Sequence, residues 1–199
     1  MARVTKRSNV VVIAVAGLVM AMVIALAEWR LDKKNIWDEL VQDAPETPEL
    51  AADYLRAEIT GFSNAQLSNL ARSIIETRDI GFSQKLTNAF IYSGKDRESK
   101  QLAVLIAEQG FIIKNDLILA NRAALEYKTG RFISKNYEKA TTILTSPLLA
   151  HVPISKFYLA EILLDDSNPN RDPKTARQLL NESAASGIEA AKKKLKEMM

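Results

Sequence analysis

Beyond position 62, apolar residues recur with the spacing of amphipathic helices, and no stretch alternates apolar and polar residues as a half-buried strand does. Five glycines stand between the expected helices, where helix terminators belong, and they are Gly81, Gly94, Gly110, Gly130 and Gly187. The pattern therefore predicts an all-α domain with helices near residues 64–78, 83–92, 97–108, 116–128, 135–144, 153–165, 172–185 and 188–198.

A different pattern fills the start of the chain. The 18 residues Val10–Ala27 contain no charged and no strongly polar side chain. As a helix they would be about 27 Å long, close to the thickness of about 30 Å of a bilayer's hydrocarbon core. Arg3, Lys6 and Arg7 precede this span and favour a cytoplasmic N-terminus. We therefore expect a cytoplasmic tail at 1–9, a single transmembrane helix in the inner (cytoplasmic) membrane, and export of the rest to the periplasm.

The same apolar span allows a second interpretation. Ala25 to Ala27 has the small-x-small form of a signal-peptidase site, so cleavage after Ala27 would release the rest of the chain. The apolar run is longer than the h-region of about 7–15 residues in signal peptides, which favours a retained anchor. Gly17, Ala21 and Ala25 recur every four residues on one helix face, which would let two such helices pair closely. Self-association through these three residues is therefore a further expectation.

Charge divides the remaining chain into two parts. Residues 28–62 carry nine acids and four bases, whereas residues 63–199 carry fifteen acids and twenty bases. Pro45 and Pro48 predict an extended break in the acidic part, flanked by short helices near 31–41 and 48–59. We therefore expect an acidic connecting segment at 28–62 and a helical domain at 63–199. Such a charge run is typical of a solvated stalk, and a docking strip for a basic partner is the alternative.

The helical domain is internally repetitive, which changes the expected architecture. Leu102, Ile143 and Leu179 coincide when three segments are aligned at offsets of 41 and 36 residues, and these segments are 99–110, 140–151 and 176–187. The helix before the second and third segments repeats as well, so the unit is a pair of helices. Stacked pairs bury a continuous core and predict an α-solenoid. The tyrosines expected to pack within and between units are Tyr92, Tyr127, Tyr137 and Tyr158.

The middle and last units share short motifs with a known repeat. In the middle unit these are Ala124, Tyr127, Gly130 and Tyr137-Glu138-Lys139-Ala140, and in the last unit they are Asp172-Pro173-Lys174-Thr175-Ala176 and Ala184-Ala185-Ser186-Gly187. Over about residues 85–191 the chain thus resembles the Sel-one-like repeat family, a relative of tetratricopeptide repeats. The resemblance implies stacked helix pairs and a scaffolding role. The alternative is a divergent tetratricopeptide-like solenoid, because Pro147 interrupts a helix and the family's tryptophan and Leu-Gly dipeptide are missing.

Residues suited to catalysis are scarce. The chain has no cysteine and one histidine, His151, so neither a thiolate site nor a zinc set is available. Gly-rich phosphate loops and nucleophile-elbow motifs are missing from the sequence. We therefore expect no enzyme, no catalytic residue, no metal and no cofactor.

Basic residues give little reason to expect nucleic acid binding. The net charge is only +3, and no aromatic residues interleave the final lysines Lys192, Lys193, Lys194 and Lys196. Cations near a helix C-terminus complement its dipole, and binding to an acidic lipid or polymer is the alternative.

A solenoid usually recognises its partner on the concave surface lined by the first helix of each unit. The outward polar residues predicted there are Asn88, Asn121, Arg122, Glu126, Lys156 and Glu161. We expect a membrane-anchored scaffold or adaptor that binds another protein of the cell envelope through these helices. The alternative is a cleaved, soluble periplasmic regulator or immunity-type inhibitor.

Overall fold

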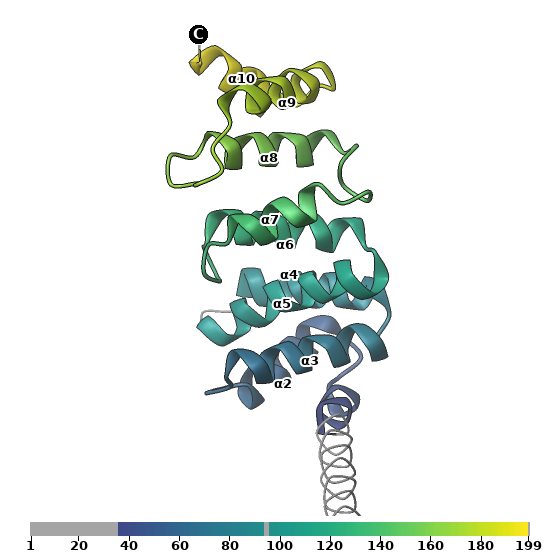
Figure 1. The fold of residues 1–199 in the computed structure, drawn as a ribbon. Coiled ribbons are helices and arrows are strands. Elements are labelled where there is room, and N and C mark those ends of the chain that lie inside the picture. The colour runs from purple at the N-terminus through teal and green to yellow at the C-terminus, as the bar shows by residue number, and fades with distance from the viewer. Residues whose placement is uncertain (1–35, 94–95, 199) are drawn as a thin grey trace, which may run out of the picture.

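The computed structural model describes residues 36–93 and 96–198, and within this part of the chain every regular element is a helix. A helical stretch at residues 36–43 comes first. The helices that follow are α2 (Pro48–Glu58), α3 (Asn64–Thr77), α4 (Ile80–Ser93), α5 (Arg97–Lys114), α6 (Leu117–Thr129), α7 (Tyr137–Leu144), α8 (Pro153–Leu164), α9 (Pro173–Ala185) and α10 (Glu189–Glu197) (Figure 1). The predicted all-α class is confirmed for these residues.

Short polar side chains define most helix starts. Ser63 and Gln66 form a reciprocal capping box at the start of α3. Asp96, Asp116 and Asn136 each accept a hydrogen bond from a backbone N–H in the first turn of α5, α6 and α7 respectively. These local signals explain why the predicted starts lie within a few residues of the observed ones.

Two of the glycines expected between helices lie inside them. Gly130 and Gly187 do end helices, with φ angles of 67° and 93°. Gly81 lies in the first turn of α4, and Gly110 lies well inside α5, which continues to Lys114. The prediction was therefore wrong at these two positions. At Gly110 the reason is packing, because a Cβ there would collide with the side chain of Leu119 in α6.

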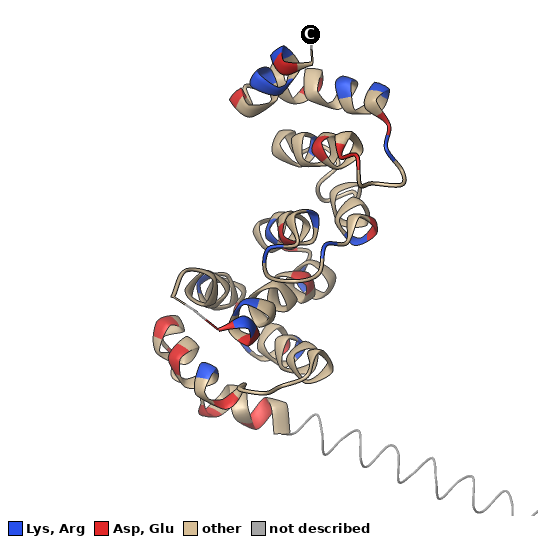
Figure 2. Ribbon diagram, turned by 90° about the vertical axis from the view of Figure 1, so that its left-hand side faces the viewer, with Lys and Arg blue, Asp and Glu red and all other residues tan. Residues whose placement is uncertain are grey.

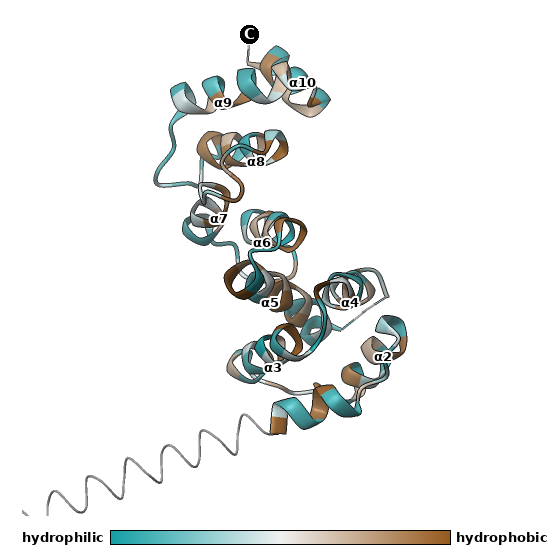
Figure 3. Ribbon diagram, turned by 90° about the vertical axis from the view of Figure 1, so that its right-hand side faces the viewer, coloured by the Kyte–Doolittle hydropathy of each residue, from teal (hydrophilic) through white to brown (hydrophobic). Residues whose placement is uncertain are grey.

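The helices form two layers of a curved stack. α4 packs on α5, α6 on α7 and α8 on α9, while α2 packs on α4 and α3 on α5. Figure 3 shows α2, α4, α6, α8 and α10 along a curve that opens to the right, with α3, α5, α7 and α9 outside it. We call the surface of α2, α4, α6 and α8 on the open side the inner face. The described chain thus has a helical-repeat-like arrangement.

The described part of the acidic segment belongs to the helical stack. Val41, Leu55 and Ile59 are buried in the main core cluster, which extends to Ile162 in α8. Arg78 Nη2 fastens this part by donating to the backbone oxygens of Val41 and Ala44, at 2.6 and 2.7 Å. Residues 36–59 therefore pack against the repeats and do not merely precede them.

Three of the four tyrosines pack as expected. Tyr127 is 3% exposed, and Tyr137 and Tyr158 lie partly buried against the main core. Tyr92 is 77% exposed, so the packing expectation was wrong for it. Its position near the end of α4 turns the ring toward the groove between α2 and α4.

The predicted membrane segment lies in the part of the chain before residue 36. Within residues 36–93 and 96–198, no helix is long and apolar enough to cross a membrane. The predicted span Val10–Ala27, the tail before it and the small residues Gly17, Ala21 and Ala25 lie outside the described residues. Gly94, the remaining predicted helix terminator, also lies outside them.

Candidate functional site

The six residues predicted to contact a partner all lie on α4, α6 and α8, the first helices of three successive pairs. Asn88 is exposed, and four others are half-buried, namely Asn121, Arg122, Lys156 and Glu161. Glu126 is fully buried. The structure therefore distributes these residues over three neighbouring helices, with unequal access to solvent.

Equivalent positions of neighbouring units meet across the inner face. Arg122 Nη2 donates to Asn88 Oδ1 at 3.5 Å, which joins α6 to α4. Ser155 Oγ donates to Asn121 Oδ1 at 2.8 Å, which joins α8 to α6. The partners in both pairs are 34 residues apart in sequence, so the same contact recurs with the repeat. These polar residues thus fix the spacing of the helices as well as lining the face.

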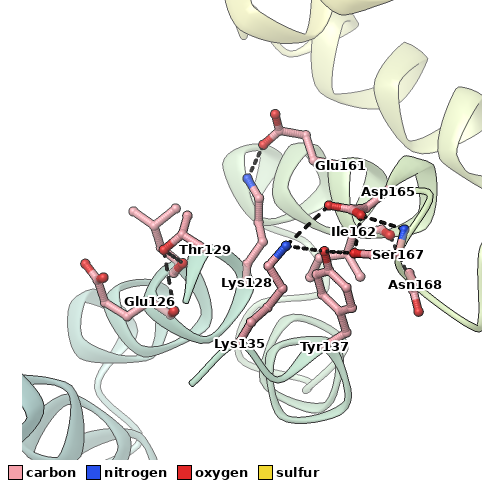
Figure 4. A network of polar contacts seen from close by, with 11 residues as sticks. Glu126, Lys128, Thr129, Lys135, Tyr137, Glu161, Ile162, Asp165, Ser167 and Asn168 are labelled. Atoms are coloured by element: carbon pink, nitrogen blue, oxygen red, sulfur yellow. Dashed lines mark hydrogen bonds and ion pairs between the residues drawn. The ribbon is translucent and has the colours of Figure 1, made fainter. Parts of the chain in front are cut away.

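Two ion pairs extend the same pattern toward the C-terminus. Lys128 of α6 pairs with Glu161 of α8 (Figure 4). Lys156 of α8 pairs with Glu182 of α9 at 2.7 Å, and the hydrogen bond from Lys156 helps lower the pKa of Glu182. Glu161 and Lys156 therefore already hold charged partners within the chain, which limits what either can offer to another molecule.

Glu126 is a correction to the predicted surface. Its carboxylate accepts hydrogen bonds from Arg131 Nη2 at 2.5 Å and Nε at 3.4 Å, and Arg122 Nη1 lies 3.9 Å away. Arg131 comes from the loop after α6, which folds back over the end of its own helix. A buried carboxylate needs such partners, so Glu126 positions two arginines and does not face a partner protein.

A groove between α2 and α4 forms the N-terminal end of the inner face. Its volume is about 460 Å³. Asn88 and Tyr92 line it from α4, and Glu49 and Asp53 line it from α2. Tyr92 is the most exposed large hydrophobic side chain among the described residues. Exposed aromatic side chains beside a cavity are common anchors for protein partners.

Arg56 holds this groove together. Its guanidinium pairs with Asp53 at 2.8 Å, donates to Ser93 Oγ at 3.2 Å and lies 3.5 Å from Asp96. By contrast, Glu49 makes no ion pair within the described residues. The two walls of the groove are therefore cross-linked through Arg56, while Glu49 stays available to a ligand.

Sequence reasoning missed most of this groove. Lys85 and Tyr92 were not among the predicted contacts, and the α2 side was assigned to a connecting segment. One signal was available in the sequence, because Tyr92 lies four and seven residues after the polar Asn88 and Lys85 and so shares their helix face. The contribution of α2 depends on tertiary packing and has no comparable local signal.

The charge on the stack changes from one end to the other. Figure 2 shows acidic residues concentrated at the N-terminal end and basic residues at α9 and α10. Burial and the carboxylates of Asp43 and Glu58 raise the pKa of Tyr54 in α2. The groove at α2 therefore lies in the acidic part of the inner face.

A second polar network joins two loops at the edge of the stack. Lys135 Nζ donates to Tyr137 Oη at 2.9 Å and lies 3.7 Å from Asp165 (Figure 4). Ser167 Oγ donates to Asp165 Oδ1 at 2.6 Å. The hydrogen bonds from Ser167 and Tyr137 hold the pKa of Asp165 well below its usual range. The network fixes the loop after α6 against the loop after α8.

The remaining strongly perturbed group lies between helices. Tyr127 Oη donates to Glu108 Oε2 at 2.6 Å, and Lys139 Nζ lies 2.6 Å from Glu108 Oε1. Burial and the Glu108 carboxylate raise the pKa of Tyr127 above its usual range, so the phenol stays protonated. This arrangement links α5, α6 and α7.

The described residues include no group of three or more His, Cys, Asp or Glu side chains placed to hold a metal ion. His151 is exposed in the turn between α7 and α8.

Comparisons with known proteins give no relatives for this arrangement. No protein-family model matches the chain, and neither a curated protein nor a solved structure matches it significantly.

Proposed function

We propose that this chain is a membrane-anchored scaffold that binds another protein of the cell envelope on its inner face. The proposal assigns the stacked pairs to the Sel-one-like or tetratricopeptide-like type, whose concave surfaces commonly bind peptides and helices. Val10–Ala27 would be the anchor, with the repeats in the periplasm. The sequence pattern of that span supports the anchor, and the two-layer stack supports the scaffold.

The observation that carries the binding proposal is the groove between α2 and α4. In this groove Tyr92 is 77% exposed and lies beside Asn88 and Lys85. Arg56 cross-links the two walls by contacting Asp53 and Ser93. A rigid aromatic side chain loses little conformational entropy when a partner covers it. A groove whose walls are already cross-linked loses little further entropy on binding. We expect the partner to insert an apolar side chain or a helix edge against Tyr92.

Arg122 and Lys156 are poor targets for substitution, because each lies beside a carboxylate of the chain. Charge reversal of Arg122 would place a carboxylate near buried Glu126, and reversal of Lys156 would oppose Glu182. Both changes would disturb the stack itself. Tyr92→Ala and Lys85→Glu alter the groove without breaking an ion pair within the described residues.

The experiment is capture of envelope proteins on the immobilised full chain, followed by mass spectrometry of the retained proteins. One protein should be retained by the native chain and lost, by at least about tenfold, with Tyr92→Ala and Lys85→Glu combined. Ile112→Ala is the matched control, because Ile112 is also an exposed apolar residue but lies on α5 in the outer layer. Equal capture by the native chain, the double variant and the Ile112→Ala variant, with unchanged melting, would contradict binding at the inner face.

A further inference from the structure

A second cavity lies away from the inner face, between the start of α5 and the loop that joins α6 to α7. Its volume is about 420 Å³, within the range of small-ligand sites. Arg97, Lys100 and Gln101 line it from α5, and the segment from Gly130 to Ser134 lines it from the loop. Two segments about 30 residues apart in sequence thus converge on one space.

The cavity gathers positive charge around an aromatic ring. Lys100 Nζ lies 4.6 Å from the centre of the Phe132 ring, and Arg131 Cζ lies 4.1 Å from the same centre. The ring attracts both cations and restricts where they point. Arg131 is fixed further by its two hydrogen bonds to buried Glu126. Arg97 and Lys100 make no ion pair within the described residues, so their charges are available to a ligand.

The Gln101 side chain adds an unpaired amide to the charged lining. Gln101 lines the cavity, is only 7% exposed, and makes no side-chain hydrogen bond within the described residues. Its amide nitrogen and oxygen remain open to solvent and are therefore accessible from the cavity. A bound anion could accept a hydrogen bond from this amide.

Asp96 also lines the cavity, and its charge is directed elsewhere. Its Oδ1 accepts the Ser99 N–H at 2.7 Å as the cap of α5, and its Oδ2 lies 3.5 Å from Arg56 Nε. Burial acts to raise the pKa of Asp96, but hydrogen bonds from Ser99 and the charge of Arg56 outweigh it and lower the pKa. The carboxylate is therefore already paired, and the lining keeps an excess of positive charge.

We propose that this cavity binds a small ligand that carries a phosphate or a carboxylate group. The Arg97 guanidinium and the Lys100 ammonium contact the anionic oxygens, and the Gln101 amide donates a hydrogen bond to the same group. Arg131 and Phe132 form the wall that keeps Lys100 in place. The cavity has room for a ligand of about the size of a substituted monosaccharide.

The test is a titration of the isotope-labelled full chain, kept in solution with a non-ionic detergent and followed by NMR. Inorganic phosphate and glucuronate are the two probes, and sodium chloride at equal ionic strength controls for screening. We expect a saturable shift of the Gln101 side-chain amide with at least one probe and none with chloride. The probe that saturates the shift identifies whether the ligand chemistry is phosphate or carboxylate.

Two variants complete the test. Arg97→Gln combined with Lys100→Gln should weaken binding of the effective probe at least tenfold, with unchanged melting in the absence of the probe. Lys193→Gln is the matched control, because Lys193 is an exposed lysine on α10 with no ion pair within the described residues, and it should bind as the native chain does. The proposal is overturned if neither probe gives a saturable shift, if chloride gives the same shift, or if the double variant binds unchanged.

Discussion

Several charged residues in the described part of the chain pair with one another instead of facing solvent alone. Lys156 pairs with Glu182, and Glu126 pairs with Arg131. The sequence predicted that Glu126 and Lys156 lie on the first helices of their pairs, because the spacing of apolar residues indicates which segments are helical. It could not predict that Glu126 is buried, since burial depends on how the loop carrying Arg131 folds back. Pairing between units is a tertiary property without a local signal.

At the residue scale, the loop network makes a prediction about pH. The pKa of Asp165 lies below its unfolded value of 3.8, because Ser167 and Tyr137 donate hydrogen bonds to the charged form. The stability that this carboxylate contributes is therefore present above about pH 4 and is lost as the pH falls toward the lowered pKa.

Asp165→Asn should lower the free energy of unfolding at pH 7 by less than about 1 kcal/mol, because the site is open to solvent and screened. Urea unfolding at pH 7 and pH 3 measures the effect. The native chain and the variant should differ at pH 7 and converge at pH 3. A difference that is the same at both pH values would contradict the assignment.

At the scale of helices, the sequence located every element but not every boundary. Gly130 and Gly187 end their helices with positive φ, as predicted. Gly110 looks the same in the sequence, yet it lies inside α5 because Leu119 of α6 occupies the space of its missing side chain. The sequence alone does not distinguish a glycine that ends a helix from one that makes room for a side chain of another helix. Only the tertiary packing distinguishes them.

The crossing of α5 and α6 gives the second prediction. Gly110→Ala should destabilise the chain by about 1–3 kcal/mol, although alanine is the better helix former, because Leu119 must move. Gly81→Ala is the control, since its added Cβ meets a single side-chain oxygen, of Asp79, at 3.1 Å, and no packed apolar side chain. Thermal melting of both variants measures the difference. A Gly110→Ala chain as stable as the Gly81→Ala chain would show that the crossing is not tight.

The small residues of the repeats give the third prediction. Ala124 in α6 is fully buried, whereas Ala184 in α9 is only partly buried against the smaller core of α8, α9 and α10. Ala124→Leu should therefore cost about 1–3 kcal/mol through overpacking, and Ala184→Leu should cost less. Denaturant unfolding measures both, with Lys193→Ala as a surface control. A larger loss at position 184 would show that the assumed packing of these units is wrong.

At the scale of the whole molecule, the all-α class and the succession of helix pairs were predictable because both arise from local, repeated patterns. The packing of residues 36–59 was not predicted. Acidic residues dominate that segment, and they obscure an apolar side formed by Val41, Leu55 and Ile59. The division of α2 into a buried apolar face and an exposed acidic face becomes clear only from its packing against α4.

The orientation of the whole chain gives the fourth prediction, which rests on the sequence of Val10–Ala27. A reporter fused after Met199 that works only outside the cytoplasm should be active. Arginine at Val19 and Ile24 should abolish that activity, because each central arginine costs about 2.5–3.5 kcal/mol on insertion scales. Activity of a reporter that works only in the cytoplasm, fused at the same point, would contradict the proposed topology.

The most direct test of the scaffold proposal is crosslinking in living cells from single positions on the two layers. A photoreactive amino acid replaces either Asn88, exposed on the inner face, or Thr142, exposed on α7 in the outer layer. We predict that position 88 crosslinks one envelope protein, that position 142 does not, and that Tyr92→Ala removes the crosslink without changing the melting temperature. Crosslinking of the same protein from position 142 alone, or from position 88 despite Tyr92→Ala, would contradict this prediction.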